Sequence, residues 1–478
     1  MIRTGDEYRE SIRDGREVWI NGERVTDVTT HPMFKPIVDV RARIYDLQHE
    51  NDLLTYEENG ERNAISYKPP RTQADWQAKR AATDIVLDDA GGVVTRVGDE
   101  TIGEMWSLLD GQDVLNQIDP TYAENVRRHI ERACYADPFH VSANTDPKGD
   151  RSKRPQDQDP DMLLHVVRET DHGIVVRGAK YETAAAYSNQ AFVKPTIANW
   201  GDDKLSDYAL GFIVEMGQRG LKYICRTGFA GRASAEDYPL SNRFDEVDTL
   251  VIFDDVEIPW ENVLFYRHTA AATFIRATLH RYSAFAFVQR MQKYADMMIG
   301  TALWNVRQTG LERQQAVQEK LAQLACYREG INAHLTASIA AAKESPGGLL
   351  MPDPSLLYTG RVLACTQLPA MMHIARELCG GQICITPDVA SFREPETGKW
   401  LEKYYSINDN WAAEDRRRLL AYGRDLLNSD YAGHRLTFQL FAQSPPFAHL
   451  GAVYRNFDWD QALSFVKDSA GLSDEVLG

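Results

Sequence analysis

The sequence predicts a multidomain α+β protein in which a helical segment is followed by a small β domain and then by a bundle of long helices. Three observations lead to this prediction: helical spacing of apolar residues in the first third, short alternating runs in the middle, and a long stretch without proline afterwards. The 478 residues suffice for about three domains. We expect these domains to span residues 1–138, 139–267 and 268–478.

The first domain shows apolar residues three and four positions apart in Val38 to Leu54, Thr72 to Leu87 and Val114 to Tyr135. A loop rich in Pro, Asp and Lys follows, from Asp146 to Pro160, and has no core-forming residues. From His165 to Phe265, runs such as GIVVRGAKYETAAA and ALGFIVEM are separated by Gly, Pro and Asp. This pattern is typical of the strands of a compact β domain.

The last domain is predicted to contain long helices that pack on one another. No proline occurs between Pro259 and Pro346, and Ala272 to Lys343 keeps helical spacing with strong helix formers. A Gly/Pro break at Ser345 to Pro354 precedes more helix, which includes a charged helix from Asn410 to Asn428.

Composition excludes several classes of partner. The formal charge of −16 repels phosphate backbones and anionic lipid headgroups, so we expect small molecules and proteins as partners rather than nucleic acid or membrane. The six cysteines are scattered without a CxxC pair or zinc-site spacing, which favours reduced thiols and no metal site. The charged start lacks an apolar signal segment, and no stretch approaches roughly 18 uninterrupted apolar residues. We therefore expect a cytoplasmic protein.

Several common catalytic motifs do not occur in the sequence. There is no GxGxxG of a dinucleotide fold, no P-loop, no GxSxG elbow and no HExxH. A redox enzyme with this sequence must therefore hold its cofactor in another way.

Four strings are the most informative parts of the sequence. In chain order they are TGDEYRESIRDGREVWINGERVTDVTTHP, TDPKGDRSKRP, ETDHGIVVRGAK and PLSNRFDEVDTLVIFDDVEIPWENVLFYR. From about Thr4 to Arg267 the chain closely resembles the 4-hydroxyphenylacetate 3-monooxygenase family of oxygenase components. The resemblance continues more weakly through the helical half, where QAVQEKLAQL also looks like the helices of acyl-CoA dehydrogenases. It implies an acyl-CoA dehydrogenase-like fold with a helical amino-terminal domain, a central β-barrel and a carboxy-terminal helical bundle, assembled as a homotetramer.

The resemblance also implies a chemistry. In this family a separate flavin reductase supplies reduced FAD, which reacts with O2 to a flavin hydroperoxide that hydroxylates an electron-rich phenol. Such a site needs a dry cavity, a group that removes the phenolic proton and a cation for the resulting oxyanion. The missing dinucleotide motif agrees with this scheme, because no NAD(P)H has to bind to this chain.

Candidate catalytic and substrate-binding residues follow from the same resemblance. His280 matches the active-site histidine and is the expected base for a phenolic hydroxyl. Arg96 aligns with an arginine that binds the substrate oxyanion, although a solvated surface arginine is an equal alternative. Where the family has a tyrosine four residues later, this chain has Glu100. Where the family has a substrate-binding histidine, it offers Ser142 by alignment or His140 by type. These departures leave the identity of the substrate open, whereas the expected type of reaction is unchanged.

Candidate cofactor-binding residues lie in three places. The loop from Ser142 to Arg151, which includes Asp146 and Lys148, and the more distant Thr183 match segments that contact FAD in the family, with Lys148 and Arg151 suited to the pyrophosphate. The alternative is a charged turn. The third place is the turn formed by Gly380, Gly381 and Gln382. It resembles the glycine turn by which a neighbouring subunit reaches the flavin in acyl-CoA dehydrogenases. The alternative is a turn that only ends a helix.

A related branch contains 4-hydroxybutyryl-CoA dehydratases, which add an iron–sulfur cluster to the same fold and FAD. Thr101, Met105 and Phe287 stand where the cluster cysteines belong. We therefore expect no iron–sulfur cluster, since its thiolate ligands are missing. A cluster-free FAD enzyme that acts on a thioester remains the alternative function, and a scaffold that has lost its flavin is a third.

Overall fold

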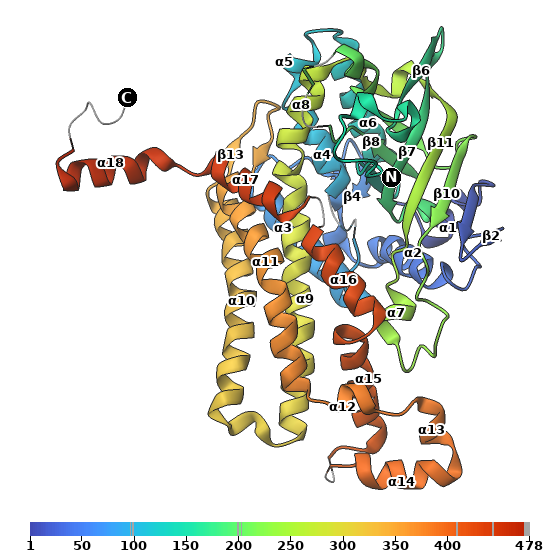
Figure 1. Cartoon of the computed structure of the whole chain (residues 1–478), viewed down its shortest axis with the longest axis vertical. Helices are drawn as coiled ribbons and strands as arrows, with labels where there is room; N and C mark the ends of the chain where they lie inside the picture. Colours follow the sequence, from blue (N-terminus) through green and yellow to red (C-terminus); the bar gives the residue numbers. More distant parts are fainter. Residues whose placement is uncertain are drawn as a thin grey trace.

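Two β-sheets lie on one side of the molecule, beside the long helices of the carboxy-terminal half (Figure 1). The computed structural model describes residues 1–95, 97, 100–197, 200–201, 203–407, 410–441 and 444–472. The larger sheet has six strands, in the order β2 (Glu23–Val25), β1 (Glu17–Ile20), β10 (Leu221–Cys225), β11 (Asp248–Pro259), β7 (Gly173–Thr183) and β6 (His165–Thr170). The smaller sheet has four, in the order β12 (Val263–Phe265), β9 (Gly211–Glu215), β8 (Gln190–Val193) and β5 (His140–Ala143).

The long antiparallel strands β7 and β11 are the backbone of the larger sheet. They pair from Asp248 opposite Thr183 to Pro259 opposite Gly173, with one irregularity between Phe253 and Val256. The two sheets face each other, because Phe212 of β9 packs edge-on against Phe253 of β11 with ring centroids 6.1 Å apart. The predicted central β domain is thus confirmed.

The amino-terminal third is mainly helical but not entirely so. Its helices are α1 (Gly5–Ser11), α2 (Lys35–Glu50), α3 (Gln73–Ala90), α4 (Glu100–Leu109), α5 (Gln112–Leu115) and α6 (Thr121–Ala136). The predicted helical segments correspond to α2, α3 and α6. Two hairpins also occur there, β1–β2 and β3–β4 (Thr55–Glu58 and Glu61–Ala64), and β1 runs parallel to β10. The first third therefore contributes strands to the central sheet, which the spacing of apolar residues did not indicate.

Three long helices stand side by side in the carboxy-terminal half (Figure 1): α9 (His280–Gln308), α10 (Gln315–Ala340) and α11 (Pro354–Cys379). The preceding α8 (Thr269–Thr278) leads into α9, and a small hairpin, β13–β14 (Lys343–Glu344 and Leu350–Met351), occupies the predicted break. Shorter helices cover the far end of the bundle: α12 (Gln382–Ile385), α13 (Val389–Arg393), α14 (Pro395–Tyr405) and α15 (Ala413–Leu427).

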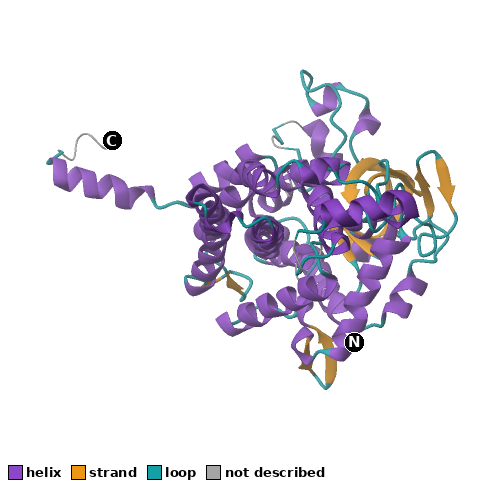
Figure 2. Ribbon diagram, turned by 90° about the horizontal axis from the view of Figure 1, so that it is seen from below, coloured by secondary structure: helices purple, strands orange, loops and turns teal. Residues whose placement is uncertain are grey.

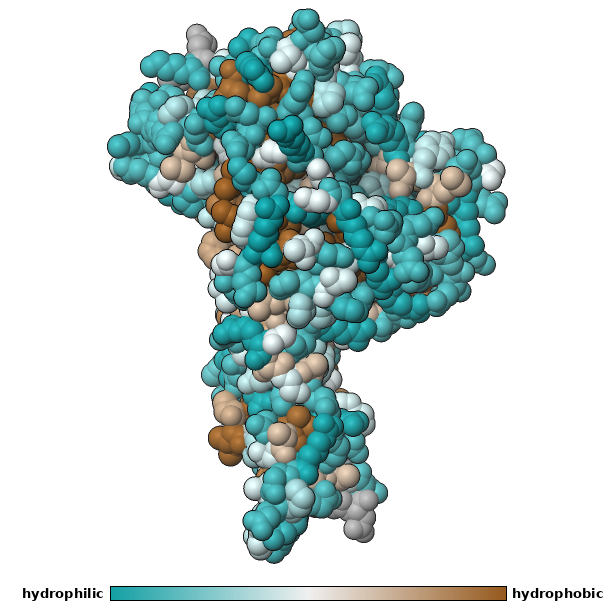
Figure 3. All heavy atoms as spheres, turned by 90° about the vertical axis from the view of Figure 1, so that its right-hand side faces the viewer, coloured by the Kyte–Doolittle hydropathy of each residue, from teal (hydrophilic) through white to brown (hydrophobic). Residues whose placement is uncertain are grey.

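From the end of α15, next to α7 (Pro239–Arg243), the chain crosses the long helices through α16 (Asp430–Phe441) and α17 (Pro446–Asn456), and α17 packs against α11 (Figure 1). The last helix, α18 (Trp459–Ala470), projects away from the rest of the molecule in both ribbon views (Figures 1 and 2). The surface in Figure 3 is largely hydrophilic, with hydrophobic patches on both the broad upper part and the narrow lower part. Among the helices in the described ranges, none is both long and apolar enough to cross a membrane.

Helix α4 lies unusually close to the start of α9. A Cβ atom added at Gly103 of α4 would lie 3.0 Å from the backbone nitrogen of Ser283 and 3.1 Å from Cβ of Tyr282. Glycine is therefore required for this approach, because any side chain would push the helices apart. The contact brings the polar residues of α4 next to the first turn of α9.

Replacing Gly103 with valine should destabilise the protein by about 1–3 kcal/mol, because the added atoms overpack the contact between α4 and α9. Gly330→Val is a matched control in the long helix α10, where nothing lies within 4 Å of an added Cβ. Thermal unfolding of both variants measures the effect. Equal melting temperatures for the two variants would show that the close approach does not constrain the helices.

Candidate active site

A cavity of about 390 Å³ opens where α4, β5, β7, β11, α9 and α16 meet, and we call it the central cavity. Its size is typical of sites for small molecules and cofactors. Its walls combine charged side chains with aromatic rings, including Glu100, Glu104, Ser142, His280, His434 and Phe438. Both ends of the chain and the β domain therefore contribute to one cavity.

Four of the residues singled out in the sequence line this cavity. Glu100 comes from α4, Ser142 from β5, Thr183 from the end of β7 and His280 from the first residue of α9. Glu100, Ser142 and His280 are buried. The fold thus brings together residues that are up to 180 positions apart in sequence, from 100 to 280.

Two buried ion pairs connect α4 to its surroundings. Glu100 Oε1 lies 3.2 Å from Arg290 Nη1 of α9, and each side chain is 2% exposed. One turn later, Glu104 Oε2 lies 2.7 Å from Lys194 Nζ, which follows β8. Buried charges of this kind are tolerated because each has a partner of opposite sign.

Ser142 joins the second of these pairs. Its Oγ donates a hydrogen bond of 2.5 Å to Glu104 Oε2, and Lys194 Nζ donates to the same Oγ. A hydrogen bond to a charged group is stronger than a neutral one, so this arrangement fixes the Ser142 hydroxyl at the cavity wall.

His280 lies beside the same cluster. Its Nδ1 is 3.1 Å from Ser283 Oγ, one turn further along α9, and 3.9 Å from Glu104 Oε1. The side chain is 10% exposed, so the imidazole is largely shielded from solvent. The carboxylate of Glu104 therefore lies between Ser142 and His280.

Asp248 links three side chains at the opposite wall of the cavity. Its carboxylate accepts hydrogen bonds from Thr183 Oγ1 at 2.5 Å and Arg226 Nε at 3.0 Å, and its Oδ2 lies 2.6 Å from His434 Nε2. Burial alone would raise the pKa of Asp248, but the contacts with His434, Arg226 and Thr183 hold it well below its usual value. The other ring nitrogen of His434 is buried and has no hydrogen-bond partner among the described residues.

A further buried pair supports the segment that precedes α4. Arg435 of α16 lies 2.8 Å from Glu246, which accepts hydrogen bonds from both the backbone and the side chain of Thr95. Burial would raise the pKa of Glu246, but Arg435 and Thr95 together lower it. Helix α16 is thereby tied to both the β domain and the amino-terminal segment.

The loop predicted to contact FAD continues directly from the cavity wall. Asn144 and Thr145 line the cavity, and Lys148 and Arg151 are exposed a few residues further on. Asp146 is buried and bonded to Lys180 of β7 and to Thr196. In this structure Asp146 therefore fastens the loop to the β domain.

The glycine turn lies elsewhere. Gly380 ends α11 with a φ of 71°, and α12 begins at Gln382, whose side chain accepts a hydrogen bond from Arg416. Figure 1 places α12 towards the far end of the bundle, away from α4 and β5. Within one chain, Gly380, Gly381 and Gln382 do not line the central cavity. Arg96 lies outside the described residues.

The positions that correspond to cluster cysteines in the dehydratases are filled by buried side chains. Thr101 Oγ1 donates to the carbonyl oxygen of His140, and Met105 and Phe287 are completely buried. In the described ranges of the chain, no group of three His, Cys, Asp or Glu side chains is arranged to hold a metal ion.

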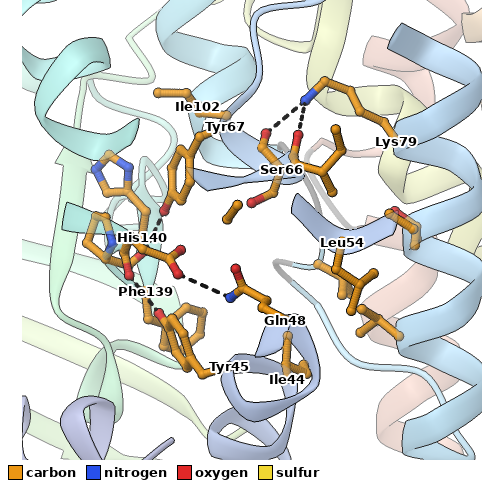
Figure 4. Close-up of a pocket in the computed structure, with 18 of the residues that line it drawn as sticks. Ile44, Tyr45, Gln48, Leu54, Ser66, Tyr67, Lys79, Ile102, Phe139 and His140 are labelled. Atoms are coloured by element: carbon orange, nitrogen blue, oxygen red, sulfur yellow. Dashed lines mark hydrogen bonds between the residues drawn. The ribbon is translucent and has the colours of Figure 1, made fainter. Parts of the chain in front are cut away.

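His140 lines a second, smaller cavity of about 80 Å³ between α2, α3 and the segment 137–140, which we call the amino-terminal cavity (Figure 4). Ser142, two residues further along β5, lines the central cavity, so β5 contributes to both walls. Gln48 donates to Asp137, while its buried amide oxygen has no partner among the described residues. The lining of this cavity is mostly apolar, so the Gln48 amide oxygen is an isolated polar position in it.

Residues 4–265 match the family described as "4-hydroxyphenylacetate 3-hydroxylase N terminal", and residues 269–471 match "4-hydroxyphenylacetate 3-hydroxylase C terminal". The chain belongs to this family. Among its members, the 4-hydroxyphenylacetate 3-monooxygenase oxygenase component of Thermus thermophilus is 30% identical, with 100% of both chains covered. The 4-nitrophenol 2-monooxygenase oxygenase component of a Rhodococcus species is also 30% identical, over 91% of this chain and 85% of that protein.

A crystal structure of the oxygenase component of 4-hydroxyphenylacetate 3-monooxygenase in complex with FAD superposes on this chain with a TM-score of 0.90. The two sequences are 29% identical, and the superposition covers 98% of this chain and 99% of the other. This chain therefore has the fold of that oxygenase component, with helical, β and helical parts in the expected order.

Sequence reasoning missed several polar residues of this hydroxylase family member's cavity. Glu104 lies one helical turn after Glu100, so its spacing on α4 was a usable signal. Asp248 and His434 line the cavity from separate segments and contact each other only in the folded chain, and Lys194 lies behind the wall, where it pairs with Glu104. No local pattern marks these three positions, because their partners are distant in sequence.

Asp137, which lines the amino-terminal cavity, should make stability depend on pH. Burial raises its pKa to about 6 from an unfolded value of 3.8. At pH 5 the folded state therefore binds a proton that the unfolded chain does not bind. The stability that this proton contributes is lost as the pH rises through 6. Asp137→Asn lacks this titration, so its stability relative to the wild type should rise by about 1 kcal/mol between pH 5 and pH 7.5.

Chemical denaturation of both proteins at the two pH values measures this difference. Asp6→Asn, at an exposed position, controls for the removal of one charge. A stability difference between Asp137→Asn and wild type that is the same at both pH values would contradict the dominance of burial over the hydrogen bond from Gln48.

Proposed function

We propose that the central cavity is where this chain hydroxylates a phenolic or other electron-rich aromatic molecule with O2 and reduced FAD. The observation that carries the proposal is that Ser142, Thr183 and His280, all predicted from the family resemblance, line one cavity. The reaction balances as aromatic C–H plus O2 plus FADH2 giving aromatic C–OH plus water plus FAD. Family membership and the FAD-bound relative support this function.

The cavity has features that fit a flavin. A volume of about 390 Å³ accommodates a ring system, His434 presents a buried nitrogen without a partner among the described residues, and Phe438 stacks on that imidazole. Asn144 and Thr145 lead from the cavity into the exposed loop that carries Lys148 and Arg151. Polar and aromatic groups thus line the cavity, while cationic groups follow at its rim.

We propose that Ser142 and Thr183 contact the flavin ring system and that Lys148 and Arg151 bind the pyrophosphate. Asp146 acts indirectly, because its bonds to Lys180 and Thr196 hold the loop in place. Three further residues would reach the flavin of a neighbouring subunit rather than that of their own: Gly380, Gly381 and Gln382. When bound, reduced FAD supplies the activation of O2.

On the substrate side, we propose His280 as the group that finally accepts the phenolic proton and Arg96 as the cation for the oxyanion. Glu100 faces the cavity but is paired with Arg290, so its part in substrate binding is to shape the wall. Ser142 is the better candidate than His140 for contact with the substrate, since His140 lines the amino-terminal cavity instead.

As an oxygenase component, the chain depends on a separate flavin reductase, and an aromatic molecule is its substrate. We further propose a homotetramer. Helix α18 supports this assembly, because it projects from a single chain and exposes Trp459, Leu463, Phe465 and Val466 (Figure 2). The hydrophobic patches in Figure 3 provide further surface for contact between copies.

A cytoplasmic location and the boundaries 1–138, 139–267 and 268–478 are also proposals. All six cysteines are free thiols, as is usual in a reducing compartment. The change from β12 to α8 near residue 267 supports the second boundary.

Purified protein supplied with FAD, a flavin reductase and NADH should consume O2 in proportion to hydroxylated product when offered suitable phenols. Product analysis by mass spectrometry across a broad aromatic panel, alongside peroxide measurement, tests this expectation. Reactions without the protein control for spontaneous flavin oxidation. Uncoupled peroxide as the sole outcome throughout the panel would count against the function.

His280→Ala should lower coupled hydroxylation by about 100-fold, because proton transfer by a positioned side chain contributes at least that much. Binding of reduced FAD, measured by anaerobic fluorescence titration, should stay within about threefold of wild type. His129→Ala removes another buried histidine outside the central cavity and serves as the control. Full coupled activity in His280→Ala would exclude the assigned role.

A further inference from the structure

A carboxylate, an ammonium group and a hydroxyl form a closed triangle at the wall of the central cavity. Glu104 Oε2 lies 2.7 Å from Lys194 Nζ and accepts a 2.5 Å hydrogen bond from Ser142 Oγ, to which Lys194 also donates. The relative exposures are 3% for Glu104, 1% for Lys194 and 4% for Ser142. Glu104 and Ser142 line the cavity, whereas Lys194 is not among its lining residues and lies behind them.

The hydrogen-bonding capacity of Ser142 determines what can bind beside it. A serine hydroxyl has one donor and two acceptor positions. Its proton is directed at Glu104 and one lone pair receives Lys194, so one acceptor position remains among the contacts of the described residues. A phenolic hydroxyl that entered the cavity would donate to this position.

We propose that Ser142 and Glu104 form a proton relay for the hydroxyl group of the substrate. The phenolic O–H bond breaks as its proton forms a bond to Ser142 Oγ, while the Ser142 proton moves to Glu104 Oε2. The electron pair stays on the phenolic oxygen, so no oxidant is needed for this step. The inference rests on the proposed function and specifies how the ring becomes electron-rich before it is hydroxylated.

Lys194 and His280 complete this relay from two sides. The Lys194 ammonium group lies next to Glu104 Oε2 and Ser142 Oγ and provides a fixed positive charge near the developing phenolate. His280 Nδ1 is 3.9 Å from Glu104 Oε1, which is beyond hydrogen-bond distance. Transfer of the proton from Glu104 to the imidazole therefore requires a rotation of the carboxyl group that brings its protonated oxygen to the ring. The relay thus places Glu104 between the substrate and the histidine that the family resemblance identifies.

The relay also defines the substrate class. The relay requires a ring substituent that donates to Ser142 and gives up its proton, as a phenolic hydroxyl does, so the methyl ether of a good phenolic substrate should be turned over at least about 100-fold more slowly. A site built around a hydrogen bond rejects an analogue that lacks the donor, because its buried polar groups then stay unpaired.

The bound ionisation state of 4-nitrophenol tests the relay without turnover. Under nitrogen and with reduced FAD present, 4-nitrophenol added to the wild-type protein should show more of the yellow phenolate than in buffer at the same pH. Ser142→Ala, which leaves the Glu104–Lys194 pair intact, and Glu104→Gln should each lower this excess at least tenfold. Ser142→Thr keeps the hydroxyl group and should therefore keep the phenolate excess.

A matched control is Asp237→Asn, which changes a carboxylate in another buried ion pair, with Arg417, outside the central cavity. It should leave the phenolate excess within twofold of wild type, and melting curves of all variants establish that they are folded. No phenolate excess with the wild type, or an equal excess with Glu104→Gln, overturns the relay. Coupled hydroxylation of the best phenol by the wild type separately decides the proposed function.

Discussion

Buried pairing of opposite charges is the interaction on which the rest of this structure depends. Several ion pairs lie at or near the central cavity and join segments that are distant in sequence, among them Glu100 with Arg290, Glu104 with Lys194, and Glu246 with Arg435. Removing a charge from water is costly, and only a well-placed partner offsets that cost. The helical parts and the β domain therefore fit together in one arrangement, and the cavity is the space that this arrangement encloses.

The same pairs explain how the cavity differs from the pattern expected of the hydroxylase family. Glu100 stands where a tyrosine was expected and is paired with Arg290. Ser142 stands where a histidine was expected and is bonded to Glu104 and Lys194. Acidic groups in a substrate site would repel a phenolate, but here each has a cationic partner. The polar wall can thus accept a proton and still tolerate an oxyanion.

Sequence patterns were sufficient for the order of the domains, because amphipathic helices and alternating strands depend on neighbouring residues. The family resemblance also located Ser142, Thr183 and His280, although all three lie outside the four strings that carry it. Sequence patterns could not reveal that β1 pairs with β10, that Asp248 lines the cavity, or that Lys194 lies behind its wall. Pairing of distant strands and burial of single charges depend on the tertiary fold.

We propose that flavin and substrate share the cavity lined by Glu104, Ser142, Thr183 and His280. A crystal structure of the protein with reduced FAD and a phenolic substrate, prepared without oxygen, tests it most directly. We predict the flavin ring system and the phenol inside the central cavity, with the phenolic oxygen in hydrogen-bond contact with Ser142. A phenol bound instead in the amino-terminal cavity beside Gln48 and His140, or a flavin bound outside the central cavity, would contradict the account.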